Sequence, residues 1–325
     1  MQKHEHVRST QRESQHSVRL ANGSVEVVLA TQVGPRILHY GLLGRRNVLA
    51  ELPSSLHSHP TSYGEPWHIF GGHRLWYAPE HAERSYYPDN QPVAVERLAR
   101  GVCLTQPVEL GSGLEKSITV ELAAEGSHVT LRHRLVNRGS ARLELAPWAL
   151  TAMAPGGRAY FPHPPYVPHP EALAPARPLV LWPFTRMSDP RFGWGDSFVS
   201  LRQDPTRADP QKIGLYDPLG YMAYALEGQL FIKRHTPRAG LHADFGCNVQ
   251  AFTNAFFLEL ETLGPLVSLG PLEQVEHEEH WFLFEAEALA EDEGELTRLL
   301  APLLQQTEQD LAGQPSSLPS PASRA

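Results

Sequence analysis

Two glutamates in one short apolar segment are the residues of this sequence best suited to chemistry. Residues 254–265, NAFFLELETLGP, have the composition of a buried β-strand, yet they include Glu259 and Glu261. Alternate side chains of a strand point to opposite faces, so both carboxylates share a face with Phe257 and the neighbouring leucines share the other. A carboxylate beside aromatic surface has a raised pKa, which suits a general base near neutral pH. A strand whose polar face is simply solvated is the alternative interpretation.

A second candidate segment is WHIFGGHRLWYAPEHAERSYYPDN, residues 67–90. Its Gly-Gly pair allows a sharp turn or a close backbone approach, and His73 and Arg74 follow at once, with Trp76 two positions later. Aromatic faces stack on a ligand with hydroxyl groups, and charged groups direct its hydrogen bonds. A tryptophan-rich corner of the core with a solvated histidine is the alternative.

The seventeen histidines raise the question of a metal site. Histidine and glutamate alternate along 277–281, HEEHW, but no HExxH spacing is present, and ligands along a single strand are too linear for a tetrahedral site. The GxSxG elbow, the P-loop and the dinucleotide-binding glycine pattern are also missing. The sequence therefore predicts no metal and no cofactor.

Charge and composition limit the partners and the compartment. A formal net charge of −8 and a pI near 6.1, without a basic run, argue against nucleic acid. No run of 18 apolar residues predicts a membrane span, and the first residues lack the apolar core of a signal peptide. Cys103 and Cys247 fit two reduced thiols. We expect a cytoplasmic protein, a monomer or homodimer, that binds a small molecule.

Alternating apolar and polar residues predict antiparallel strands along most of the chain. The candidate strands are 24–31, 94–110, 117–122, 128–136, 141–150, 220–235, 254–265 and 277–286. One helix is expected at 295–312, where Pro302 would kink or split it. The pattern predicts an all-β fold, a large sandwich domain over residues 17–311, between a flexible polar tail at 1–16 and a disordered tail at 312–325.

Many of the 29 prolines gather in residues 155–178, PGGRAYFPHPPYVPHPEALAPARP. This density argues against a central strand or a helix. The segment also contains aromatic residues and histidines, which favour an ordered loop beside a site.

Several segments together resemble a known family. They are GPRILHYGLLGRRNVL, GGHRLWYAPE, YYPDN, PWALTAMAPGG, KIGLYDPLGYMAY, ADFGCNVQAFTNAFFLELETLGP and EHEEHWFL, and they extend from about residue 20 to residue 285. In these segments the chain resembles an uncharacterised bacterial family related to the galactose mutarotase (aldose 1-epimerase) superfamily. The resemblance implies a large antiparallel supersandwich with a ligand cleft on one concave face, where both glutamates would face a sugar.

The resemblance also implies a mechanism with a glutamate base and a histidine acid. Mutarotases have their base in a stretch similar to Leu260-Glu261-Thr262, which assigns the base to Glu261. The acid would be His73, which follows a Gly-Gly pair, or His163. In the second case the histidine follows the aromatic pair Tyr160-Phe161, whereas in mutarotases it precedes the aromatics.

The implied substrate is an aldose or a sugar phosphate, and the implied activity is that of a 1-epimerase, an isomerase. The expected substrate contacts are Arg74, Trp76, Trp148, Lys212, Asp244 and Glu259. Two alternatives remain at this point: a carbohydrate-binding or sensing domain without catalysis, and a lyase or hydrolase that acts on an oligosaccharide.

Overall fold

The computed structural model describes residues 12–14, 16–56, 58–286 and 292–313. Most of the two predicted tails, at residues 1–11 and 314–325, lies outside the described residues. The chain divides into two compact units, Met1–Glu287 and Ala288–Ala325.

The smaller unit contains helix α2, Glu293–Ala312, which confirms the helix predicted at 295–312. Asp292 caps its first turn by accepting a hydrogen bond from the Glu295 backbone N–H at 2.9 Å. Pro302 lies inside α2, and the helix continues on both sides of it. No helix among the described residues combines the length and apolar character that a membrane crossing requires.

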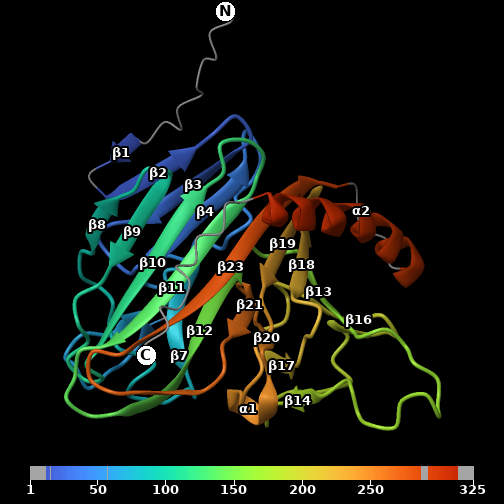
Figure 1. Cartoon of the computed structure of the whole chain (residues 1–325). Coiled ribbons are helices and arrows are strands. Elements are labelled where there is room, and N and C mark those ends of the chain that lie inside the picture. Colours follow the sequence, from blue (N-terminus) through green and yellow to red (C-terminus); the bar gives the residue numbers. More distant parts are fainter. Residues whose placement is uncertain (1–11, 15, 57, 287–291, 314–325) are drawn as a thin grey trace, which may run out of the picture. The chain divides into compact units, whose positions relative to one another are not determined.

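The larger unit consists mainly of two antiparallel sheets, which confirms the predicted all-β sandwich (Figure 1). In spatial order, the eleven-stranded sheet contains β1 (Arg12–Ser14), β2 (Ser17–Ala21), β3 (Val25–Ala30), β4 (Arg36–Leu42), β7 (His73–Ala78), β12 (Leu143–Met153), β21 (Leu258–Leu263), β20 (Val249–Thr253), β17 (Gln211–Leu215) and β14 (Leu179–Leu181), with β22 (Val267–Leu269) paired to β12.

The ten-stranded sheet contains β15 (Phe192–Trp194), β16 (Phe198–Arg202), β13 (Arg158–Pro162), β18 (Tyr221–Leu226), β19 (Gln229–His235), β23 (Gln274–Glu285), β11 (Val129–Asn137), β10 (Leu114–Leu122), β9 (Gly101–Thr105) and β8 (Ala94–Arg97). The remaining elements are β5 (Ser58–His59), β6 (Trp67–His68) and the short turn α1 (Ala243–Gly246).

Two strands lie in segments that the sequence predicted to be a tail or a loop. Strand β1 lies within the stretch expected to be a flexible tail, and it pairs with β2. Strand β13 lies within the proline-rich segment, between β16 and β18, so the expectation that this segment excludes a central strand is wrong. The prolines do not interrupt it, because Pro162 is its last residue and positions 158–161 contain none.

The main core lies between the two sheets. Leu75 and Leu260 from one sheet and Leu131 and Phe231 from the other belong to one buried cluster. Each strand that contributes to this core leaves its alternate side chains on the opposite face of its sheet. In β21, Leu258 and Leu260 therefore fill the core, and Glu259 and Glu261 lie on the far side of the sheet, as the sequence predicted.

A buried ion pair crosses this core. Lys233 of β19 lies 2.8 Å from Glu279 of β23, and both side chains are fully buried. The same ammonium donates hydrogen bonds to Thr151 Oγ1 (2.9 Å) and to the backbone carbonyl of Leu260 (3.0 Å). Burial lowers the pKa of Lys233, whereas Glu279 opposes that shift. The pair thus joins one sheet to β12 and β21 of the other.

Two imidazoles extend this network. His133 Nδ1 donates to the His277 carbonyl (2.9 Å), which leaves its Nε2 as an acceptor for His73 Nε2–H at 2.6 Å. The Thr151 hydroxyl, 2.9 Å from His73 Nδ1, then donates to that nitrogen. Burial lowers the pKa of both rings, which agrees with neutral tautomers.

We expect Glu279→Gln to lower the free energy of unfolding by about 3–5 kcal/mol, because Lys233 would become an unpaired charge in the core. Urea denaturation followed by tryptophan fluorescence measures the loss. Glu285→Gln is the matched control, since it removes an exposed partner of Arg45 and should cost far less. Equal losses in the two variants would contradict a charged, buried pair.

Candidate functional site

The residues predicted for the site gather on the outer face of the eleven-stranded sheet. Leu150 of β12 pairs with Arg74 of β7 on one side and with Glu261 of β21 on the other. In the same way Trp148 pairs with Trp76. Directly paired residues point to the same face. The register therefore brings together side chains that are far apart in the sequence.

A cleft of about 430 Å³ opens on this face, within the size range of small-molecule sites. Its aromatic lining includes Trp67, Trp76, Tyr86, Trp148, Trp182, Phe252 and Phe257, and its charged lining consists of Arg74, Glu80, Lys212 and Glu259. Large apolar faces with a few charged groups are the composition expected for a small-molecule site.

One ion pair in the cleft joins Arg74 and Glu259. Arg74 Nη1 lies 2.8 Å from Glu259 Oε1, and both side chains are almost fully buried. The guanidinium also lies over the rings of Trp76 (4.6 Å) and Trp67 (5.5 Å). Glu259 is thus neutralised, and Arg74 is fixed against the aromatic wall.

A second ion pair joins Lys212 and Glu261. Lys212 Nζ lies 3.1 Å from Glu261 Oε2, which also accepts a hydrogen bond from Trp148 Nε1 at 2.8 Å. The ammonium lies over the rings of Trp148 (4.8 Å) and Trp182 (4.9 Å). Lys212 and Trp148 line the cleft, and Glu261 lies behind them.

The two carboxylates differ in burial. Glu259 is 6% exposed and reaches the cleft, whereas Glu261 is 0% exposed. Within the described part of the chain, Glu261 Oε1 has no hydrogen-bond partner. Burial raises the pKa of Glu261 to about 7, with Lys212 opposing the shift and Glu259 adding to it. This carboxyl group changes its charge near neutral pH, as a general base requires.

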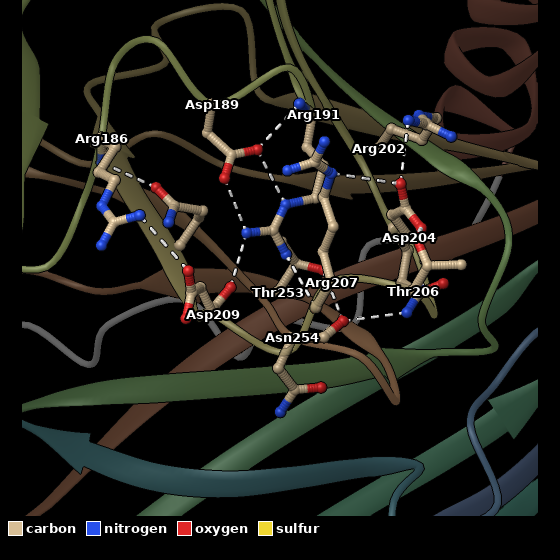
Figure 2. Close-up of polar contacts among 12 residues, drawn as sticks. Arg186, Asp189, Arg191, Arg202, Asp204, Thr206, Arg207, Asp209, Thr253 and Asn254 are labelled. Atoms are coloured by element: carbon tan, nitrogen blue, oxygen red, sulfur yellow. Dashed lines mark hydrogen bonds and ion pairs between the residues drawn. The ribbon is translucent and has the colours of Figure 1, made fainter.

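The connection between β14 and β17 contributes Trp182, Phe184 and Pro210 to the cleft lining. Figure 2 shows a network of arginines and aspartates within this connection. The Arg191 guanidinium is fully buried, contacts both Asp189 oxygens at 3.0 Å and donates to the Asp209 carbonyl at 2.6 Å. Close by, the Thr185 hydroxyl donates to the Lys212 carbonyl, and it accepts from the Trp182 backbone N–H at 3.3 Å. Trp182 is thereby held beside Lys212.

The structure brings most of the predicted contacts together. Arg74, Trp76, Trp148, Lys212 and Glu259 all line the cleft, in front of the predicted base. The lining also includes aromatic residues that the sequence did not indicate, among them Tyr86, Trp182, Phe184 and Phe252. Tyr86 lies in the tryptophan-rich segment and had a signal there, whereas Trp182 comes from a connection without any motif.

Neither predicted acid joins the base. His73 lies on the inter-sheet face of β7, because it alternates with Arg74, and its Nε2 is bonded to His133. His163 follows β13 in the other sheet and does not line the cleft. The proline-rich segment at 155–178 contributes no lining residue either, so the expected loop beside the site is not found there.

Asp244 lies next to the site and not in its lining. It belongs to α1, where its φ of 51° is left-handed. Its Oδ2 accepts a hydrogen bond from Gln250 Nε2 at 2.7 Å, and Gln250 pairs with Glu261 across β20 and β21. Asp244 therefore supports a neighbour of the base.

The buried cluster of His73, His133 and Glu279 has the residue types of a metal site, with donor atoms within 4.8 Å of one another. Its carboxylate, however, already accepts hydrogen bonds from Thr262 and from Trp281 Nε1 (3.0 Å) and pairs with Lys233. The ammonium supplies the positive charge that a metal would bring. These contacts favour a structural network over a metal centre.

Comparisons with known proteins identify the fold. The chain is similar to Slr1438 from Synechocystis sp. PCC 6803 (11% identity, 85% of this chain and 97% of that one, TM-score 0.54). It is also similar to a galactose mutarotase-like protein from Lactobacillus casei ATCC 334 (10% identity, 82% of this chain and 100% of that one, TM-score 0.50). A third match is a candidate aldose 1-epimerase from Klebsiella pneumoniae subsp. pneumoniae MGH 78578 (10% identity, 89% of this chain and 83% of that one, TM-score 0.54).

No family model and no curated protein matches the sequence. The structural matches nevertheless agree with one another, and the fold is galactose mutarotase-like.

The raised pKa of Glu261 predicts a pH-dependent stability. Folding favours the protonated form of the Glu261 carboxyl group. Its contribution to the free energy of unfolding is therefore fully present below about pH 4.5 and is lost as the pH rises through about 7. Over this pH range the free energy of unfolding of the wild type should fall by up to about 3 kcal/mol relative to that of Glu261→Gln, because the glutamine does not ionise.

Urea unfolding of both proteins across this pH range measures the difference. Glu227→Gln, which removes an exposed carboxylate paired with Arg46, is the matched control and should follow the wild-type curve. A difference between wild type and Glu261→Gln that stays constant with pH would contradict the raised pKa.

Proposed function

We propose that the cleft binds an aldose in its pyranose form and catalyses the exchange of its anomers. The observation that carries this proposal is Glu261. It is a buried carboxylate directly behind an aromatic cleft, with one oxygen held by Trp148 and Lys212 and the other without a partner among the described residues. Its titration near pH 7 suits a group that gains and loses a proton in each turnover. The mutarotase-like fold is in keeping with this chemistry.

The charges of the cleft favour a neutral sugar over a sugar phosphate. The two cations, Arg74 and Lys212, are each paired with a glutamate, and Glu80 adds a further negative charge to the lining. A phosphate group needs uncompensated cations or backbone N–H groups. Sugar hydroxyls, in contrast, both donate and accept, so they match paired charges and unpartnered atoms such as Trp67 Nε1.

In the proposed reaction Glu261 accepts the proton of the anomeric hydroxyl, directly or through one water, while an acid protonates the ring oxygen. The bond between C1 and the ring oxygen breaks, and C1 becomes an aldehyde carbon. Rotation about the C1–C2 bond and closure on the other face give the second anomer. Trp76 and Trp148 supply the stacking surfaces that hold the sugar.

Carbohydrate binding without catalysis is the second candidate. It is favoured by one observation: neither His73 nor His163 lies in the cleft. In that case Glu261 would only accept hydrogen bonds, and Glu261→Gln would weaken binding by about 1–3 kcal/mol without removing any activity.

A measurement of anomer exchange distinguishes the epimerase from a protein that only binds carbohydrate. Freshly dissolved α-D-glucose or α-D-galactose is followed by polarimetry with wild type and with Glu261→Gln. We expect acceleration by the wild type and a loss of about 10²–10⁴-fold in the variant, because the base is removed. Glu285→Gln, remote from the cleft, is the control. No acceleration with any common aldose would contradict the epimerase and leave binding as the function.

The raised pKa of Glu261 also predicts how the rate of anomer exchange depends on pH. The base acts as a carboxylate, so kcat/KM should rise with pH and level off above about pH 7. Rates measured from about pH 3.5 to about pH 9, with the uncatalysed rate subtracted, show this rise. A rise centred near the ordinary glutamate pKa of 4.5 would contradict Glu261 as the titrating group.

A further inference from the structure

The proton donor of the ring-opening step has to lie next to Glu261. The anomeric oxygen and the ring oxygen are bonded to the same carbon, so the groups that exchange protons with them must be neighbours. Among the described residues, Glu261 receives its hydrogen bonds from Trp148 and Lys212. The indole N–H of Trp148 does not titrate in water, which leaves Lys212.

Lys212 is placed to contact both the base and the sugar. It lines the cleft, and its Nζ lies 3.1 Å from Glu261 Oε2. An ammonium has three N–H groups, of which one is used on Glu261, so two remain for a ligand. Trp148 and Trp182 hold the ammonium between their faces at 4.8 and 4.9 Å.

Two other nitrogen-bearing side chains of the lining, Arg74 and His59, fit this role less well. Arg74 is committed to its ion pair with Glu259. His59, the histidine among the described lining residues, is exposed and packs on Tyr86 with a ring distance of 4.3 Å. Neither of them contacts Glu261.

We propose that Lys212 is the general acid, in the role that a histidine was expected to fill; this inference rests on the proposed epimerase function. Lys212 gives a proton to the ring oxygen while Glu261 takes the proton of the anomeric hydroxyl. The electron pair of the C1–O5 bond moves to O5, and the O1–H pair forms the C1=O1 bond. Ring closure reverses both transfers, so no other reactant is consumed.

The buried environment lowers the free-energy cost of this double proton transfer. It converts the ammonium–carboxylate pair into a neutral amine and a neutral acid, and burial disfavours the two charges that disappear. The two indole faces hold the ammonium beside Glu261 through cation–π attraction.

Lys212→Arg separates charge from acidity. Arginine keeps the positive charge and the hydrogen bond to Glu261, but it does not give up its proton. We expect anomer exchange to fall by about 10²–10⁴-fold. Binding of 1,5-anhydro-D-glucitol, a pyranose without an anomeric hydroxyl, should be retained when followed by tryptophan fluorescence.

Lys116→Arg is the matched control. Lys116 also forms a buried ion pair, 2.5 Å from Glu109, and also lies over an aromatic ring, that of Tyr77 at 5.3 Å. It belongs to β10 of the other sheet and does not line the cleft. Anomer exchange should remain at the wild-type rate in this variant.

A second variant keeps the test valid if arginine does not fit between the indoles. Lys212→Ala should be inactive and should regain anomer exchange when ethylammonium is added, because that ion carries a transferable proton. Tetramethylammonium has the same charge and no such proton, so it should not restore activity.

The outcomes separate the two proposals. Wild-type activity in Lys212→Arg, or equal rescue by both ammonium ions, would overturn the role of Lys212 and leave the epimerase intact. No acceleration by the wild type would overturn the epimerase, and this inference with it.

Discussion

The site depends on the electrostatic cost of placing two carboxylates on a strand that is buried on both faces. Strand β21 places Leu258 and Leu260 in the inter-sheet core and its two glutamates on the cleft side of the sheet. A buried charge without a partner is far more costly than a paired one, so each glutamate requires a cation. Arg74 meets this need for Glu259, and Lys212 meets it for Glu261. The cations come from strands on opposite sides of β21, Arg74 from β7 and Lys212 from β17.

The pairing is not equally complete for the two glutamates. Glu259 retains some exposure to the cleft, whereas Glu261 is fully buried, and burial outweighs the attraction of Lys212. The resulting pKa near 7 makes the ionised form of Glu261 costly for the fold. Such a cost is typical of functional positions, where a reactive protonation state matters more than stability. The buried network around Lys233 and Glu279 lies on the inter-sheet face of the same strands and fixes their backbone.

The structural matches and the site convey different information. Proteins that share only about a tenth of their residues with this chain have the same arrangement of two large sheets. Sheet packing requires apolar residues at alternate positions, and many sequences meet that requirement. The side chains on the cleft face are not constrained in this way. A mutarotase-like fold can therefore contain a lysine, Lys212, that lies between two tryptophans and beside Glu261.

The sequence by itself determined the all-β architecture, the C-terminal helix and the face on which Glu259 and Glu261 lie, because the period of two and the helical pattern depend on local geometry. It also selected Arg74, Trp76, Trp148 and Lys212 as members of the site. Only the tertiary structure decided how these residues are paired, since the order of the strands sets which side chains meet.

The position of the histidines was decided in the same way. His73 is adjacent to Arg74 in the sequence, and in a strand adjacency places two side chains on opposite faces, so His73 belongs to the core. Arg191 contacts Asp189 and Asp209, which come from separate parts of the connection between β14 and β17 (Figure 2), and the same connection carries Trp182. Local patterns hold no information on such contacts, because they arise only when the chain folds back on itself.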